Sequence, residues 1–150
     1  MVEQARRRCP GVGNITWLHG HLFDRTVPLP VGAYDAITAV SSLHHMPLQP
    51  ALQRFAELLR PGGVLAVVGH YLPAPVSDLG LELIRLPANA AVGAALALRG
   101  RAGKPDDNGM PVMVPSTTLT NVRAAAQMCL PGARLRRGLF WRYMLTWRSR

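Results

Sequence analysis

The chain has 150 residues, 49% of them hydrophobic, and its 17 basic and 8 acidic residues give a formal net charge of +9 at pH 7. This length suits one buried core, so we expect a single domain over residues 1–150. The most apolar region, residues 79–98, contains charged residues and a proline, which excludes a membrane span, and no signal peptide is recognisable. Cys9 and Cys129 show neither metal nor disulfide spacing, so a reducing, cytoplasmic location is expected.

The positive charge raises the question of a nucleic-acid partner. All basic residues except Lys104 are arginine, in a chain rich in alanine and proline, and this mixture is typical of GC-rich coding. The arginines are scattered, and only Arg6–Arg8 and the C-terminal tail form clusters. A specific nucleic-acid partner is therefore not favoured, and such a partner would make binding strongly salt-dependent.

The N-terminal part of the chain predicts one helix and one strand. Residues Val2–Arg8 have the pattern of an amphipathic helix, and a loop follows at Pro10–Asn14. The sequence Gly11-Val12-Gly13 is not a phosphate-binding turn, because no strand precedes it and no helix follows it. Residues Ile15–Leu18 are then predicted to form a short strand, which is followed by His19-Gly20-His21-Leu22-Phe23 and by a proline-bearing loop, Asp24–Ala33.

The central unit of the chain is a predicted strand, helix and strand. Its strands, Ala36–Val40 and Val64–Val68, are short apolar runs rich in β-branched residues, a pattern typical of parallel strands covered on both faces. Pro50 suits the first turn of the helix between them, and Pro61-Gly62-Gly63 ends that helix. A unit of this kind joins parallel strands by a right-handed crossover. The apolar face of the helix carries Leu52, Phe55, Ala56 and Leu59.

The chain beyond Tyr71 predicts a helix followed by a long polar loop. Asp78 is placed to cap the helix, which Pro87 should kink, and the small apolar residues Ala88–Leu98 continue it. The alternatives for this run are a flap over the substrate and a helix that covers one face of the sheet. The polar stretch Gly100–Pro115 is the best candidate for a substrate lid.

The last part of the chain predicts a helix and a hairpin. Thr118 or Thr120 can cap a helix that runs to Leu130. Residues Ala133–Trp147 alternate in places between aromatic or apolar residues and arginines, which is typical of strands. Gly138 permits a bend, so we expect two antiparallel strands.

Two stretches of the central unit carry a resemblance to a known family. YDAITAVSSLHHM at Tyr34–Met46 and FAELLRPGGVLAVV at Phe55–Val68 resemble the fourth strand, helix and fifth strand of class I S-adenosylmethionine-dependent methyltransferases. The closing LPGARLRRGLFWRYMLTWR resembles the C-terminal hairpin of small bacterial methyltransferases. The resemblance implies an α/β, Rossmann-like sheet, mostly parallel, with a C-terminal antiparallel hairpin.

The resemblance also implies S-adenosylmethionine as cofactor and a small molecule as substrate. In the family, the strand that Ile15–Leu18 matches ends in Gly-Asp and an apolar residue, and the aspartate accepts a hydrogen bond from the adenine amino group. The matching cofactor-binding residues here are Gly20, His21 and Leu22, and a neutral imidazole nitrogen in place of the carboxylate can accept one hydrogen bond. The methionine end of the cofactor and the substrate are expected near Val40, Ser41 and Ser42, past the carboxyl end of a strand.

Histidines at strand ends are the candidate catalytic groups. His44 and His45 follow Ala36–Val40, and an imidazole titrates near neutrality, so either can act as a general base. Alternatively, one caps the following helix and the other supports it, because many methyl transfers need only positioning. All five histidines follow predicted strands and can converge at one edge. No cysteine or well-placed carboxylate joins them, so no metal site is expected.

Three parts of the family pattern are not found in the chain: the first strand, the glycine-rich turn after it and the acidic residue that ends the second strand. We therefore expect a truncated or remnant domain, missing the first strand–helix–strand, that is inactive alone. The alternative is a non-catalytic interaction or regulatory protein on the same fold. Loss of those strands leaves an open strand edge, which favours self-association. The methyl acceptor is not specified by the sequence.

Overall fold

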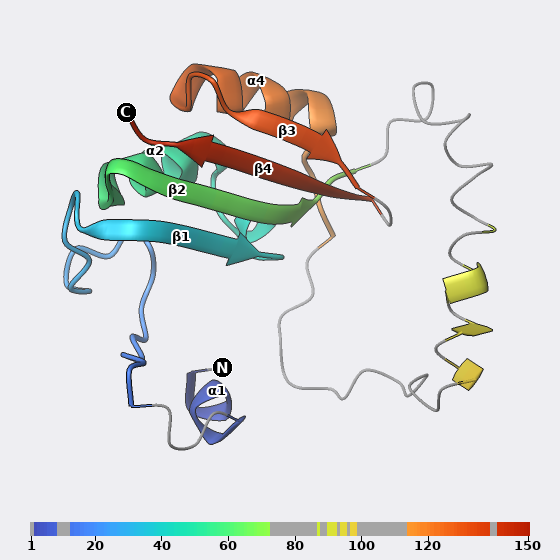
Figure 1. Cartoon of the computed structure of the whole chain (residues 1–150), viewed down its shortest axis with the longest axis horizontal. Helices are drawn as coiled ribbons and strands as arrows, with labels where there is room; N and C mark the ends of the chain where they lie inside the picture. The colour runs from blue at the N-terminus through green and yellow to red at the C-terminus, as the bar shows by residue number, and fades with distance from the viewer. Residues whose placement is uncertain are drawn as a thin grey trace.

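The computed structural model describes residues 2–8, 13–72, 114–138 and 141–150, together with the helical residues 87, 90–92, 94, 95, 97 and 98 (Figure 1). No helix among the described residues is long and apolar enough to cross a membrane. In chain order the elements are α1 (Val2–Arg8), β1 (Tyr34–Val40), η1 (Leu43–His45), α2 (Leu48–Leu58), β2 (Leu59–His70), α4 (Leu119–Cys129), β3 (Arg134–Arg137) and β4 (Arg142–Arg148).

The sheet has four strands in the order β1-β2-β4-β3 (Figure 1). Strands β1 and β2 are parallel and are joined by η1 and α2, so the predicted crossover unit is confirmed. Strands β3 and β4 form the predicted C-terminal hairpin, which closes through the Gly138 amide donating to the Arg142 carbonyl at 2.7 Å. The fold is α/β, with the parallel crossover unit and the closing antiparallel hairpin that the resemblance implies.

The predicted strand Ile15–Leu18 is not formed. These residues have no ladder partner in the described structure, and the side chains of Ile15 and Leu18 are 39% and 41% exposed. Their sequence favours a strand, but a strand is stable only when its backbone groups pair with a neighbour. The described sheet has one parallel pair and two antiparallel pairs, so it is not mostly parallel, because β4 of the C-terminal hairpin also pairs antiparallel with β2.

The N-terminal helix is confirmed, but it lies apart from the sheet (Figure 1). Its described side-chain contacts are ion pairs within the helix, from Glu3 to Arg6 and Arg7. A seven-residue helix gains little stability from its own backbone. The family strands against which this helix would pack are not found in the sequence.

The core lies on one face of the sheet, where α2 and α4 contact each other and cover β2 and β4. The sequence predicts cover on both faces, and this is wrong for the described residues. On the opposite face Val40, Val64 and Met144 are 67%, 41% and 49% exposed. The alternation of β2 produces this result, because only every second side chain points to the helices. Among the core residues are Leu52, Phe55, Leu65, Val67, Val122, Ala126, Tyr143 and Leu145.

Helix α2 runs directly into β2, without a loop. The helix ends at Leu58, and two of its last carbonyls, of Glu57 and Leu58, accept hydrogen bonds from the Gly32 and Ala33 amides at 2.8 and 3.0 Å. The chain that leads into β1 therefore caps α2. Gly63 lets β1 and β2 start close together, since a Cβ there would lie 3.0 Å from the Tyr34 carbonyl oxygen.

Thr118 is the residue that caps α4. Its hydroxyl accepts a hydrogen bond from the Asn121 amide at 3.3 Å. Thr118 also pairs with Leu72 in an isolated parallel bridge, in which the Leu72 amide donates to the Thr117 carbonyl at 2.9 Å. The start predicted for a helix at Asp78 and nearly all of the predicted lid Gly100–Pro115 lie outside the described residues.

Candidate functional site

The loop that follows β1 is held tightly at the carboxyl edge of the sheet. Ser41 has a φ of 50°, and its amide donates to the Val68 carbonyl at 2.8 Å, so pairing with β2 extends one residue beyond the strand. The His45 amide donates to the Ser42 carbonyl at 3.1 Å and closes the turn of η1. Leu43, only 1% exposed, anchors the turn in the core. The backbone therefore fixes the histidine pair at this edge.

The structure brings three histidines together at this edge. The ring centroids of His44 and His45 are 4.1 Å apart, and the ring of His70, the last residue of β2, meets His44 edge-on at 5.7 Å. The expected position of His44 and His45 is thus what the structure shows, and His70 joins them. His19 and His21 are exposed in the segment before β1, and no ring contact joins them to this cluster in the described structure.

The surroundings of His44 and His70 favour the neutral forms of these two imidazoles. Burial lowers the pKa of His44, and the neighbouring His45 and His70 lower it further. Burial also lowers the pKa of His70, with a smaller contribution from Arg142. The Arg142 Nε–H donates to His70 Nε2 at 3.3 Å, so neutral His70 carries its proton on Nδ1. Buried His44 Nδ1 has no hydrogen-bond partner in the described structure. A neutral imidazole with an unpaired nitrogen is suited to accept a proton.

The predicted adenine side is held by local contacts. Gly20 admits no side chain, because a Cβ there would overlap Cγ2 of Val27. Leu22 is half-buried and packs against the same core that contains Leu43. His21 is exposed, and its Nδ1 accepts a hydrogen bond from the Phe23 amide at 3.3 Å. The other ring nitrogen of His21 therefore carries the proton in the neutral form and can only donate.

This geometry fits S-adenosylmethionine only in part. Val40 offers exposed apolar surface next to Ser41 and Ser42 at the carboxyl edge, as a cofactor at this position requires. His21, however, has no acceptor left for the adenine amino group, and the described residues include no glycine-rich turn between a strand and a helix. The described residues do not make a complete site for this cofactor. They also contain no group of three histidine, cysteine or acidic residues placed to hold a metal ion.

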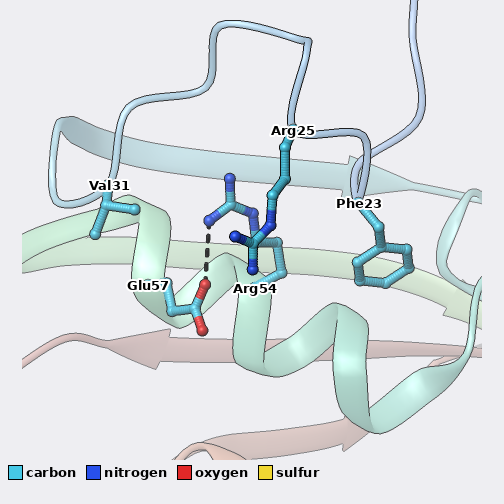
Figure 2. A pocket seen from close by; sticks show the side chains of 5 residues that line it. All are labelled: Phe23, Arg25, Val31, Arg54 and Glu57. Carbon is cyan, nitrogen blue, oxygen red and sulfur yellow. Dashed lines mark hydrogen bonds and ion pairs between the residues drawn. The ribbon is translucent and has the colours of Figure 1, made fainter.

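A hollow, which the sequence did not predict, lies between α2 and the loop before β1 (Figure 2). Its volume is about 540 Å³. The sequence shows Arg54 only as a polar residue on the outer face of the helix, and nothing in the loop marks the residues that meet it. The lining residues are Phe23, Arg25, Val31, Arg54 and Glu57.

The fold and the histidine cluster define an α/β protein that presents polar groups at the carboxyl edge of its sheet, where such folds bind ligands. Comparison with known proteins makes this more specific. Residues 1–67 match the family described as methyltransferase domain. Uncharacterized methyltransferases of Mycobacterium bovis and Mycobacterium tuberculosis are 34% identical over 137 residues, which is 90% of this chain and 64% of the relatives.

Two further similarities are more limited. A 27-O-demethylrifamycin SV methyltransferase of Amycolatopsis mediterranei is 44% identical over 57 residues, which is 37% of this chain and 20% of that enzyme. The crystal structure of a possible exported protein from Bordetella parapertussis superposes with a TM-score of 0.46 at 17% identity, over 81% of this chain and 41% of that chain. The resemblance to class I S-adenosylmethionine-dependent methyltransferases is confirmed over residues 1–67, which match the methyltransferase-domain family.

Proposed function

We propose that this chain forms the acceptor side of a methyltransferase that acts on a hydroxyl group of a small molecule. The observation that carries the proposal is the cluster of His44, His45 and His70 at the carboxyl edge. The Amycolatopsis relative, whose name describes an O-methyltransferase acting on a small natural product, supports a hydroxyl acceptor. When bound, S-adenosylmethionine supplies the methyl group.

In the proposed reaction, the histidine pair removes the proton of the acceptor. An imidazole nitrogen of His44 or His45 would take the hydroxyl proton as the acceptor oxygen gains the methyl group. The methyl carbon–sulfur bond of the donor would break, with its electron pair leaving on the sulfur, and the imidazolium would later release the proton to water. Burial stabilises the neutral form of His44 before the reaction, so the base is ready at neutral pH. His70, oriented by Arg142, supports the ring of His44 from the side.

A second candidate function is a non-catalytic regulatory protein on the same fold. The observation that favours it is the hydrogen bond from the Phe23 amide to His21, which uses the ring nitrogen that could have accepted from adenine. The glycine-rich turn of the family is also not found in the sequence. The two functions differ in whether a chain with the missing elements restored transfers a methyl group.

The first experiment is calorimetric titration of the 150-residue chain with S-adenosylmethionine. We expect no binding at micromolar concentration, because two or three charge-assisted contacts, each worth about 1.5–3 kcal/mol, are missing. At about 1.4 kcal/mol per decade, their loss weakens binding roughly a thousandfold or more. Micromolar binding at one site per chain would show that the present residues suffice.

The second experiment restores the leading strand–helix–strand from a mycobacterial relative and measures transfer to simple phenols and alcohols. In this chimera, His44→Gln with His45→Gln should lower kcat by about 10²–10⁴, the usual contribution of a general base, and leave cofactor affinity unchanged. His19→Gln, an exposed histidine outside the cluster, is the matched control. A chimera that binds the cofactor but transfers to no acceptor would favour the non-catalytic function.

His21 gives a separate test in the same chimera. His21→Asp should tighten cofactor binding by about 1 kcal/mol, or roughly fivefold. One carboxylate oxygen can keep the hydrogen bond from the Phe23 amide while the other accepts from the adenine amino group. Unchanged or weaker affinity by calorimetry would remove His21 from the cofactor site.

A further inference from the structure

The hollow between α2 and the loop before β1 has the features of a binding site, and it lies away from the histidine edge. Helix α2 starts after the carboxyl end of β1 and ends where the chain enters β2, so Arg54 and Glu57 lie toward the amino edge of the sheet. The cluster of His44, His45 and His70 lies at the carboxyl edge. The volume of about 540 Å³ is within the range of small-molecule sites, roughly 300–1,000 Å³.

Hydrogen bonds hold both walls of the hollow in place, with α2 on one side and the loop before β1 on the other. The Arg54 Nη2 donates to the Leu29 carbonyl at 3.4 Å, and the Gly32 amide donates to the Glu57 carbonyl at 2.8 Å. At the other end of the loop, the Val27 amide donates to the Asp24 carbonyl at 3.3 Å and closes a turn that contains Arg25. The loop therefore has a fixed path across the helix, and the hollow is preformed.

The charges in the hollow do not balance. Arg54, whose side chain is only 20% exposed, forms an ion pair with Glu57 at 3.1 Å. The side chain of Arg25 points toward the same space from the opposite wall (Figure 2). No hydrogen bond or ion pair joins its guanidinium to another described residue. The adjacent carboxylate of Asp24 is engaged by the Thr26 amide and hydroxyl, at 2.8 and 2.7 Å.

Two guanidinium groups thus share one hollow with a single carboxylate, which leaves one unneutralised positive charge. Each guanidinium has five N–H donors, and Arg54 uses two of them, one to Glu57 and one to Leu29. The remaining lining residues, Phe23 and Val31, are apolar. The chemistry that matches this lining is an anion with an apolar body, since a guanidinium binds a carboxylate through parallel hydrogen bonds.

We propose that Arg25 and Arg54 form a binding site for a small organic carboxylate whose apolar part contacts Phe23 and Val31. Glu57 competes with this ligand, because it occupies one side of the Arg54 guanidinium. The site is additional to the methyl-transfer site and shares none of its residues. Removing the charge of Arg25 should therefore weaken ligand binding, whereas removing the charge of Glu57 should strengthen it.

The test is an NMR titration of the uniformly ¹⁵N-labelled chain with benzoate at constant ionic strength. We expect saturable shifts at the amides of Phe23, Arg25 and Val31. Arg25→Gln should weaken binding about tenfold, the equivalent of one charge-assisted hydrogen bond. Glu57→Gln should strengthen binding several-fold, since it frees donors of Arg54. Arg123→Gln, which removes an exposed arginine of α4, is the matched control and should change nothing.

Two comparison compounds, one neutral and one a purely polar anion, separate this site from general attraction to a chain of charge +9. Benzyl alcohol, which has the apolar body without the charge, should not saturate the site, and inorganic phosphate should bind more weakly than benzoate. The proposal is overturned if Arg25→Gln and Arg123→Gln have equal effects, or if Glu57→Gln does not strengthen binding. The native spectrum of each variant reports that it is folded, and the two informative variants change opposite walls.

Discussion

Gly69 in β2 is a position where a single added methyl group should lower stability. It lies directly opposite Tyr143 of β4, and a Cβ there would lie 2.7 Å from Cε1 of the tyrosine ring and closer still to Cζ and Oη. Carbon atoms in contact are normally about 3.5–4.0 Å apart, so the ring would have to move by roughly 1 Å. Tyr143 is 3% exposed and belongs to the core, so it cannot move into solvent.

The magnitude for Gly69→Ala follows from two opposing effects. Overpacking a buried contact costs about 1–3 kcal/mol. Replacing a strand glycine by alanine returns roughly 0.5–1 kcal/mol, because the unfolded chain loses freedom. We expect a net loss of about 1–2 kcal/mol in the free energy of unfolding. For a chain of this size that lowers Tm by roughly 2–8 °C.

The assay is urea unfolding followed by circular dichroism. An unchanged m-value would show that the variant exposes the same surface on unfolding and still unfolds in one transition. Gly13→Ala is the matched control, because no atom lies within 4 Å of a Cβ at that position. Combining Gly69→Ala with Tyr143→Leu should recover part of the loss, since the ring that clashes is gone. Equal stability of Gly69→Ala and Gly13→Ala would refute the reasoning.

Three further predictions concern titration and association. The folded pKa values of His44 and His70 are lowered, so the unfolded chain binds more protons below about pH 6.5. The free energy of unfolding should therefore be at its full value above that pH and fall as pH drops below it, and His44→Gln combined with His70→Gln should flatten this dependence in urea titrations. Burial raises the pKa of Tyr143 to about 12, so an ultraviolet titration should show one phenol ionising near that pH, and Tyr143→Phe should abolish it. The stability linked to this phenol is present below pH 10 and is lost as pH rises through 12. Sedimentation velocity should show concentration-dependent association through β1, one of the two edge strands of the described sheet, and Thr38→Lys should reduce it while Thr120→Lys on α4 does not.

The parts of the fold that the sequence predicts are those whose contacts are local. The crossover unit needs only an apolar helix face between two strands and a glycine pair at the return, and Thr118 caps α4 through a residue three positions away. The hairpin likewise pairs neighbouring segments. Ile15–Leu18 fails as a strand for the opposite reason. Its propensity is sufficient, but a ladder depends on a partner elsewhere in the chain, which local pattern does not reveal.

The candidate site divides in the same way. His44 and His45 are placed by the end of their own strand, so their position follows from the pattern. The approach of His70 depends on the register of β1 with β2, and the pairing of His70 with Arg142 depends on that of β2 with β4. The hydrogen bond from the Phe23 amide to His21 Nδ1 fixes the tautomer of His21, so that its other ring nitrogen can only donate. A residue pattern does not predict the tautomer of a histidine. The hollow at Arg25 and Arg54 results from the path of an irregular loop and has no periodic signature.

The bridge between Leu72 and Thr118 also bears on how this chain can be engineered. The bridge pairs Leu72 with Thr118, so the 45 residues between them belong to a loop that is closed at this point. The described residues between 87 and 98 are exposed, so their removal takes no described residue from the core. Replacing residues 73–113 by a linker of about five residues shortens the closed loop to about nine residues, a little over two doublings, which lowers its entropic cost by about 1.4 kcal/mol. A minimal scaffold of this kind would allow insertions from different methyltransferases to be exchanged on one unchanged sheet.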